Sequence, residues 1–356
     1  MTPLEIINIF APSSKVQAQM GSITLEEALS FSLSKTLLTH TRFNQAITQI
    51  AELHHHCKHN SVGKGYMVFG PSGVGKSTVL KYYWKNFPII HAKQKTIIPV
   101  LFILAPSSPS ASNLAEAILL ALGDPLAKRS RGRGNTGESF TNRVYELLIA
   151  CEVEMILIDE VQHVSHVASI FHYRVVTDWL KNMIEKTRIP VVIFGLEASE
   201  LVVKSSEQLS RRFSSQLKIS AFNLNDDQDF IEFRAVMKGL QEALPLSVAE
   251  PLYEANLARR FLVASNGLIG YLSPILEEAV VVATKAGLNQ LDMQTYAAAF
   301  RNNVWSLVPD RLNPFHPESP LRMLNRPGEP YCAEDKLVHI GTPLASRHIN
   351  KAQKKD

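Results

Sequence analysis

Short apolar runs alternate with amphipathic stretches through the first two thirds of the chain. The runs indicate buried strands, and the stretches between them have the apolar spacing of helices. We expect strands at 65–70, 96–105, 155–160, 189–196 and 217–222, and helices at 40–58, 77–87, 112–123, 138–152 and 173–186. Strands that alternate with helices in this way predict a mostly parallel sheet covered by helices on both faces.

The pattern changes at about Asn223, after which only helical spacing is found. Four helices are expected there, at 226–244, 251–265, 269–287 and 291–305. Residues 306–356 contain seven of the 19 prolines, which favours an extended, partly ordered tail. We therefore divide the chain into an N-terminal extension (1–38), an α/β core (39–222), a small helical lid domain (223–305) and a proline-rich tail (306–356).

Composition places the chain among folded proteins that are not embedded in a membrane. Apolar residues make up 46% of the 356 residues and charged residues 20%. No apolar run is long enough for a membrane span, and the first residues do not resemble a signal peptide. The three cysteines are widely spaced, so we expect no disulfide framework and a cytoplasmic location. A net charge of +4 is compatible with nucleic-acid binding but does not require it.

The stretch GPSGVGKST predicts a loop that binds the phosphates of a nucleoside triphosphate. Gly70, Gly75, Lys76 and Ser77 match G-x-x-x-x-G-K-[ST], between an expected strand and an expected helix. Lys76 would neutralise the β- and γ-phosphates, and the hydroxyl of Ser77 or Thr78 would reach Mg²⁺. The ATP-binding residues predicted here are Gly70, Pro71, Ser72, Gly73, Val74, Gly75, Lys76, Ser77 and Thr78.

Two further segments carry candidate catalytic residues. Asp159 and Glu160 follow an apolar run, where Asp159 would hold Mg²⁺ through water and Glu160 would orient the attacking water. Their alternative interpretation is a solvated acidic turn. Arg211 and Arg212 could be a simple surface pair, but they could also supply a cation to the γ-phosphate bound by a neighbouring subunit. In that case ATP would bind between the subunits of a homo-oligomer.

Together these segments are similar to the AAA+ ATPases of transposons known as TniB and TnsC. The resemblance rests on GPSGVGKST, LIDEVQHV, WLKNMIEKTRIPVVIFGL and QLSRRF, in this order, and covers roughly residues 40–300. It implies a AAA+ P-loop NTPase with a parallel αβα core and a helical lid. It also implies ATP-dependent assembly on double-stranded DNA as a ring or filament. Such an assembly links a TniQ-type targeting protein, in some cases a CRISPR-associated one, to the transposase.

The chain departs from this family at two positions near the expected nucleotide. The fourth strand ends in Gly195, Leu196 and Glu197, without the small polar residue that often senses the γ-phosphate. Tyr271 lies near the place where many AAA+ lids carry an arginine. Both departures predict hydrolysis that is slow or stimulated by a partner.

Several other residues are candidates for binding. Lys128, Arg129, Arg131 and Arg133 form a glycine-rich basic loop that could follow DNA phosphates, although a solvated surface loop has the same composition. Arg42 lies where related ATPases close over the adenine. His55 and His59 have the spacing of a zinc pair, but a polar helix end is the simpler interpretation. The apolar residues of the tail, in 313–324, could contact the transposase.

A different class of ATPase shares part of this pattern. ATPases of bacterial secretion assembly also combine a P-loop with an Asp-Glu pair, and they remodel protein partners rather than DNA. They usually carry a membrane segment or a peptidoglycan-binding domain, and neither is indicated here. A small-molecule kinase is a third possibility, but the helical domain and Arg211/Arg212 argue against it.

Overall fold

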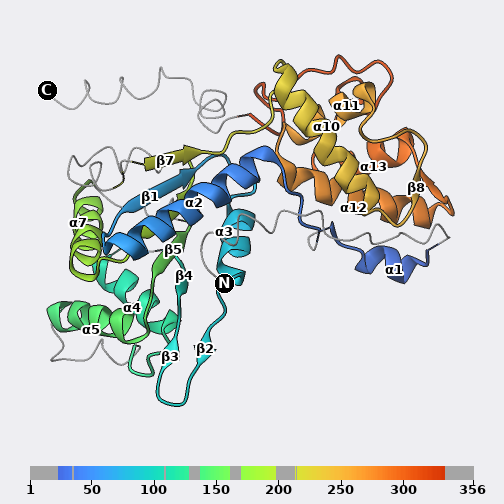
Figure 1. Ribbon diagram of the computed structural model, residues 1–356. Coiled ribbons are helices and arrows are strands. Elements are labelled where there is room, and N and C mark those ends of the chain that lie inside the picture. Colours follow the sequence, from blue (N-terminus) through green and yellow to red (C-terminus); the bar gives the residue numbers. More distant parts are fainter. Residues whose placement is uncertain are drawn as a thin grey trace, which may run out of the picture. The chain divides into compact units, whose positions relative to one another are not determined.

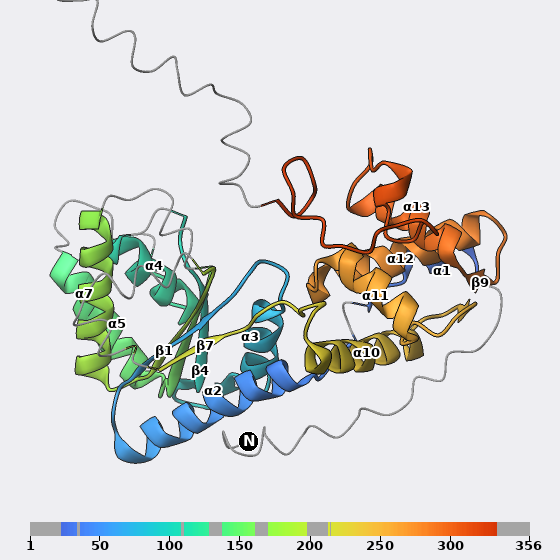
Figure 2. The ribbon, with the colours of Figure 1, turned by 90° about the horizontal axis from the view of Figure 1, so that it is seen from above.

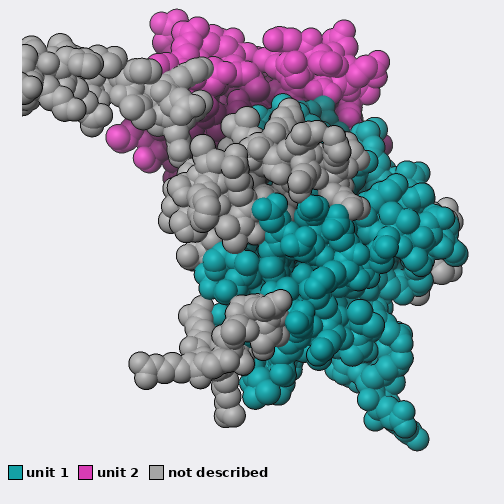
Figure 3. Space-filling model, turned by 90° about the vertical axis from the view of Figure 1, so that its left-hand side faces the viewer, with its two compact units in different colours: residues 1–14, 39–220 teal, residues 15–38, 221–356 magenta. Residues whose placement is uncertain are grey.

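The computed structural model describes residues 23–33, 36–107, 110–127, 137–160, 170–197, 213 and 215–332. These residues form two compact units. The first contains the described residues between 39 and 220, and the second contains those before 39 and after 220. Figure 3 colours the two units separately.

A five-stranded parallel sheet forms the centre of the first unit, with the strand order β4-β5-β6-β1-β7. Every pairing in it is parallel, as between Gly65 and Val191 or between Val100 and Met155. The strands are β1 (Gly65–Phe69), β4 (Val100–Leu104), β5 (Met155–Asp159), β6 (Val191–Gly195) and β7 (Ser215–Lys218). The parallel sheet predicted from the apolar runs is confirmed.

Helices cover both faces of this sheet (Figures 1 and 2). The helices of one face are α2 (Thr41–Asn60) and α3 (Lys76–Lys85), and those of the other are α4 (Ala111–Ala121), α5 (Gly137–Ala150) and α7 (Ile170–Thr187). Alternate strand residues point to opposite faces, so Met67 and Ile156 belong to the core beneath the second group. Phe102 instead packs its ring against Trp84 of α3, at 5.5 Å between ring centroids.

A small hairpin replaces the first part of the strand expected at 96–105. Strands β2 (Ile90–His91) and β3 (Thr96–Ile97) pair antiparallel, and β4 begins only at Val100. Pro99 separates β3 from β4. Proline has no N–H for a sheet ladder, so the apolar run is divided there. The carbonyl of Pro99 accepts hydrogen bonds from the N–H groups of Glu154 and Met155.

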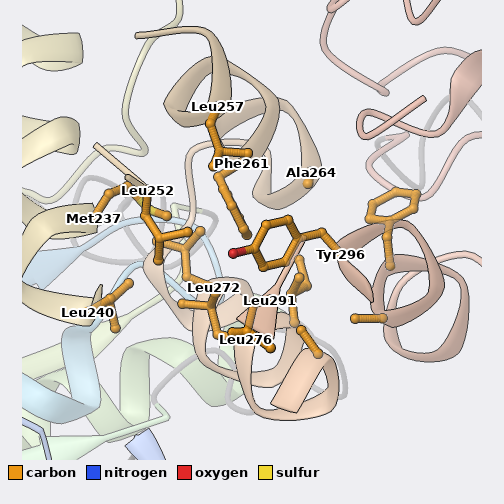
Figure 4. Close-up of a cluster of buried hydrophobic side chains, with 14 of the residues drawn as sticks. Met237, Leu240, Leu252, Leu257, Phe261, Ala264, Leu272, Leu276, Leu291 and Tyr296 are labelled. Carbon is orange, nitrogen blue, oxygen red and sulfur yellow. The ribbon is translucent and has the colours of Figure 1, made fainter. Parts of the chain in front are cut away.

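The second unit is mainly helical and has one continuous apolar core (Figure 4). Its helices are α1 (Leu25–Ser30), α10 (Asp227–Glu242), α11 (Ala255–Ser265), α12 (Ile269–Lys285) and α13 (Met293–Asn303), with a 3-10 turn η4 (Asp310–Leu312). The sequence pattern indicated helices only, yet β8 (Ser247–Val248) and β9 (Gln290–Leu291) pair as short parallel strands. Among the described residues no single helix has the length and apolar character to cross a bilayer. Taken together, α11 and α12, bent by 110° at their junction, would be long and apolar enough by length and composition alone.

Residues 306–332 and α1 pack onto this helical core. Phe315 is 2% exposed, and its ring lies 4.9 Å from Phe261 between centroids. The guanidinium of Arg260 donates hydrogen bonds to the carbonyls of Pro314 (2.7 Å) and His316 (2.8 Å). Near the N-terminal end of the chain, the N–H of Leu33 donates a hydrogen bond to the carboxylate of Glu277 on α12 at 2.6 Å. Residues 333–356 lie outside the described part of the chain.

Candidate nucleotide site

The loop after β1 is held in a shape that requires glycine. Gly73 (φ 78°) and Gly75 (φ 102°) are left-handed, a conformation that residues with a Cβ rarely adopt. A Cβ on Gly70 would lie 2.1 Å from the carbonyl oxygen of Ile219, so the two backbones approach closely. Gly75 is also the N-cap residue of α3. The loop therefore brings backbone N–H groups and the positive end of α3 to one place, an arrangement that suits phosphate.

The side chain of Lys76 folds over this loop. Its Nζ donates hydrogen bonds to the carbonyls of Gly70 and Pro71, both at 2.8 Å, and the residue is only 9% exposed. Burial lowers the pKa of Lys76, while the negative charges of Asp159, Glu160 and Glu197 act in the opposite direction. A buried ammonium group beside the phosphate-binding loop has the position needed to neutralise phosphate oxygens.

Ser77 and Asp159 meet at the carboxyl end of β5. Ser77 Oγ donates to Asp159 Oδ2 at 2.8 Å, and Asp159 Oδ1 accepts the N–H of Glu160 at 2.9 Å. Asp159 is 4% exposed. A hydroxyl and a carboxylate side by side form the oxygen donor set that Mg²⁺ prefers, so these residues fit a magnesium ion. Thr78 differs, because it is exposed on the first turn of α3.

Glu160 follows Asp159 with a backbone that is unusual for its type. Its φ is 62°, in the left-handed region. The bond from its N–H to the Asp159 carboxylate holds this turn at the end of β5. Residues 161–169, which follow Glu160 in the chain, lie outside the described part of the structure.

Of the other residues considered for the site, Arg42 and Tyr271 belong to the described part of the chain and the rest do not. Arg42 lies in the first turn of α2, half-buried, and its contact with adenine stays a prediction. Tyr271 belongs to the second unit, where its ring meets Tyr331 edge-on at 5.3 Å. The candidates that lie outside the described residues are Lys128, Arg129, Arg131, Arg133, Arg211 and Arg212.

Sequence reasoning missed an ion pair close to the predicted site. Glu197 follows β6, and its Oε1 lies 3.0 Å from Nζ of Lys218, at the end of β7. The charge of Glu197 also raises the pKa of Lys76 against the effect of burial. In the sequence, Glu197 stands out only as a departure from the family pattern. The strand order brings these three residues to one edge of the sheet, and no local pattern could indicate it.

The histidines at the end of α2 do not extend into a metal site in the described residues. The rings of His55 and His59 lie 4.2 Å apart between centroids. Across the described part of the chain, no group of three or more histidine, cysteine, aspartate or glutamate side chains could hold a metal ion.

The contact between Ser77 and Asp159 predicts which hydroxyl serves the metal. We expect Ser77→Ala to raise the Mg²⁺ concentration needed for half-maximal nucleotide binding by about tenfold, because it removes one of two adjacent oxygen donors. Thr78→Ala is the matched control and should leave this concentration nearly unchanged. A Mg²⁺ titration of a fluorescent ATP analogue measures both. Equal shifts in the two variants would contradict the assignment.

The strand order β4-β5-β6-β1-β7, with the glycine-rich loop after β1 and a helical unit following the sheet, is that of the AAA+ P-loop fold. Solved structures of the same fold are similar over most of the chain. The ORC2 protein of Aeropyrum pernix, in ADPNP–ADP complexes, has a TM-score of 0.56 at 15% identity, over 80% of this chain and 72% of that one. CDC6P of Pyrobaculum aerophilum has a TM-score of 0.57 at 14% identity, over 80% and 73%. The Aeropyrum pernix ORC1 protein in complex with DNA has a TM-score of 0.54 at 13% identity, over 78% and 68%.

Sequence comparison assigns the family more narrowly. The family described as bacterial TniB protein matches residues 29–221, more than half of the chain. The chain belongs to the TniB family. Among curated proteins, none is similar enough to match. The AAA+ fold and the TniB resemblance expected from the sequence are both confirmed.

Proposed function

We propose that this chain is an ATP-hydrolysing regulator of DNA transposition. In this proposal it assembles on target double-stranded DNA and links a TniQ-type targeting protein to the transposase. The observation that carries the proposal is membership of the TniB family, over a segment that includes the whole candidate nucleotide site. The TniQ-type protein and the transposase enter as partners through the family resemblance alone.

The contacts of four residues support separate roles for them in ATP binding and hydrolysis. These residues are Lys76, Ser77, Asp159 and Glu160. Lys76 binds the β- and γ-phosphates, and Ser77 and Asp159 hold Mg²⁺. Glu160 orients the attacking water and accepts its proton. When bound, MgATP supplies the phosphoanhydride bond that this water cleaves. The buried position of Lys76 and Asp159 excludes bulk water from the charged part of the site, which strengthens each electrostatic interaction.

A complete site needs a further cation, and we assign it to a second copy of the chain. Arg211 or Arg212 of one subunit stabilises the γ-phosphate charge in the site of its neighbour. Arg42 closes over the adenine within the same subunit. ATP is then bound at the interface between subunits. ATP binding therefore favours assembly of a ring or filament, and ATP hydrolysis favours its disassembly.

DNA is the proposed template of this assembly. Lys128, Arg129, Arg131 and Arg133 contact its phosphates without reading bases. The similarity of fold to a protein solved in complex with DNA is in keeping with this role. Target specificity comes from the partners.

Electron microscopy of the full chain with linear duplex DNA tests the proposal. We expect rings or filaments with ATP, and none with ADP or without nucleotide. They should persist in Glu160→Gln, which retains ATP, and should be lost in Lys76→Ala, which does not bind it. Monomers under every condition would overturn the proposal and favour the remodelling of a protein partner.

A further inference from the structure

The amino ends of the parallel strands carry a surface that the nucleotide site does not use. Four segments meet there: residues 55–64 at the end of α2, 85–99 from the end of α3 through the hairpin, 151–154 before β5, and 184–190 at the end of α7. The Ile98 N–H donates to the Cys151 carbonyl at 2.8 Å, and the N–H of Val191, the residue after 184–190, donates to the Lys64 carbonyl at 3.0 Å. We call these four segments the basic edge.

Exposed cations dominate the basic edge. Its lysines and arginine, all exposed, are Lys58, Lys64, Lys85, Lys93, Lys95, Lys186 and Arg188. Its carboxylates are Glu152, Glu154 and Glu185. Two of these carboxylates are already engaged, Glu154 with Lys58 at 2.6 Å and Glu152 with Lys95. The edge therefore keeps a strong excess of positive charge after its internal ion pairs are formed.

The β2–β3 hairpin carries part of this charge away from the sheet (Figure 1). Residues 88–95 are all exposed, and Lys93 lies in the turn that the Ala92 N–H closes onto the Lys95 carbonyl at 3.0 Å. A hairpin of two-residue strands gains little from its own pairing. Its lysines raise the local positive potential at the amino end of β4, where a large anion can reach them.

We propose that the basic edge binds the phosphate backbone of duplex DNA. The inference rests on the proposed function in taking DNA as the ligand of this chain. Duplex DNA offers about one negative charge per 1.7 Å of axis, which matches cations spread over several elements rather than gathered in one pocket. The charge is carried almost entirely by lysine, which is depleted at protein–protein interfaces but effective against phosphate. An acidic protein chain fits the edge less well for this reason.

The location of the edge gives its DNA binding a distinct property. The strands of the sheet are parallel, so their amino ends lie opposite the carboxyl ends that carry Ser77, Asp159 and the phosphate-binding loop. DNA contact at the basic edge therefore does not require nucleotide. This separates it from assembly on DNA, which the proposed function makes dependent on ATP.

The test compares two double variants of the full chain that change its net charge equally. Lys85→Glu/Lys93→Glu alters the basic edge. Lys238→Glu/Lys285→Glu is the matched control, because these lysines are exposed on α10 and α12 and both Lys85 and Lys285 end a helix. Binding to a fluorescein-labelled linear duplex is followed by anisotropy without nucleotide, across a series of salt concentrations. Nucleotide affinity and the melting temperature of each variant show that the fold is retained.

We expect the edge variant to bind the duplex about tenfold more weakly than the control at low salt. The slope of log K against log salt should fall by about two, since each lost phosphate contact removes about 0.9. Equal affinity and slope in the two variants would overturn the inference. So would binding of a poly-glutamate peptide that the edge variant loses while its DNA affinity is unchanged. If the difference is found but ATP produces no assembly on DNA, the basic edge stands and the proposed function fails.

Discussion

Glu160→Gln is expected to lower kcat for ATP hydrolysis by about a hundredfold or more, with little change in ATP affinity. The amide keeps the size and the hydrogen-bonding reach of the carboxylate but cannot take a proton from water, and general base catalysis typically contributes about 10²–10⁴-fold. Lys76 and the Ser77–Asp159 pair, to which we assign the phosphates and the metal, are untouched by the change. Single-turnover hydrolysis and equilibrium binding of a fluorescent ATP analogue measure the two effects separately.

Glu197→Gln is the control that distinguishes a base from a background charge. The negative charge of its carboxylate also raises the pKa of Lys76, and the carboxylate forms an ion pair with Lys218 at 3.0 Å. If Glu160 works only by its charge, both variants should slow hydrolysis by similar factors. A few-fold effect for Glu197→Gln beside a large one for Glu160→Gln supports the assignment of the proton to Glu160. The reverse order would move the catalytic base to the end of β6.

The sequence predicted those parts of the molecule whose causes are local. A buried strand must be apolar along its length, so β1, β5 and β6 are visible as runs such as MILI before Asp159. The phosphate-binding loop is equally visible, because the positive φ of Gly73 and Gly75 and the lysine that follows them lie within a few residues. Strand order then placed Asp159 near Ser77 as expected for a parallel sheet.

The unpredicted parts depend on which distant segments meet. Glu197 and Lys218 are ordinary charged residues until β6, β1 and β7 are aligned. The basic edge is likewise assembled from four segments, none of which has an unusual charge by itself. Periodicity does not report such groupings, because it describes how one element is buried and not which elements are neighbours.

The residues after 305 are a second case in which hydrophobic periodicity does not reveal packing. Prolines at 309, 314 and 317 predict an extended chain, and extended chain without periodicity resembles a free tail. In the structure, that extended segment supplies Phe315 to the core and presents two carbonyls to Arg260. Asn313 is buried as well, and its side chain donates to the carbonyl of Ala297 at 3.0 Å. An irregular segment can be fully packed when its polar backbone groups find partners of this kind.

Phe315→Ala should therefore destabilise the second unit by about 3–5 kcal/mol, the usual cost of deleting a buried phenylalanine ring. The ring is 2% exposed between Phe261 and Tyr296, and its removal leaves a cavity that these two aromatic residues border. Leu307→Ala is the control from the same segment, since Leu307 is 86% exposed and should change stability by less than about 0.5 kcal/mol. Hydrogen exchange measured by mass spectrometry locates the effect: amides of α11 and α13 should exchange faster in Phe315→Ala, while those of β1 and β5 keep their protection. Equal protection in the two variants would contradict the stabilising role that we assign to the Phe315 ring in the helical core.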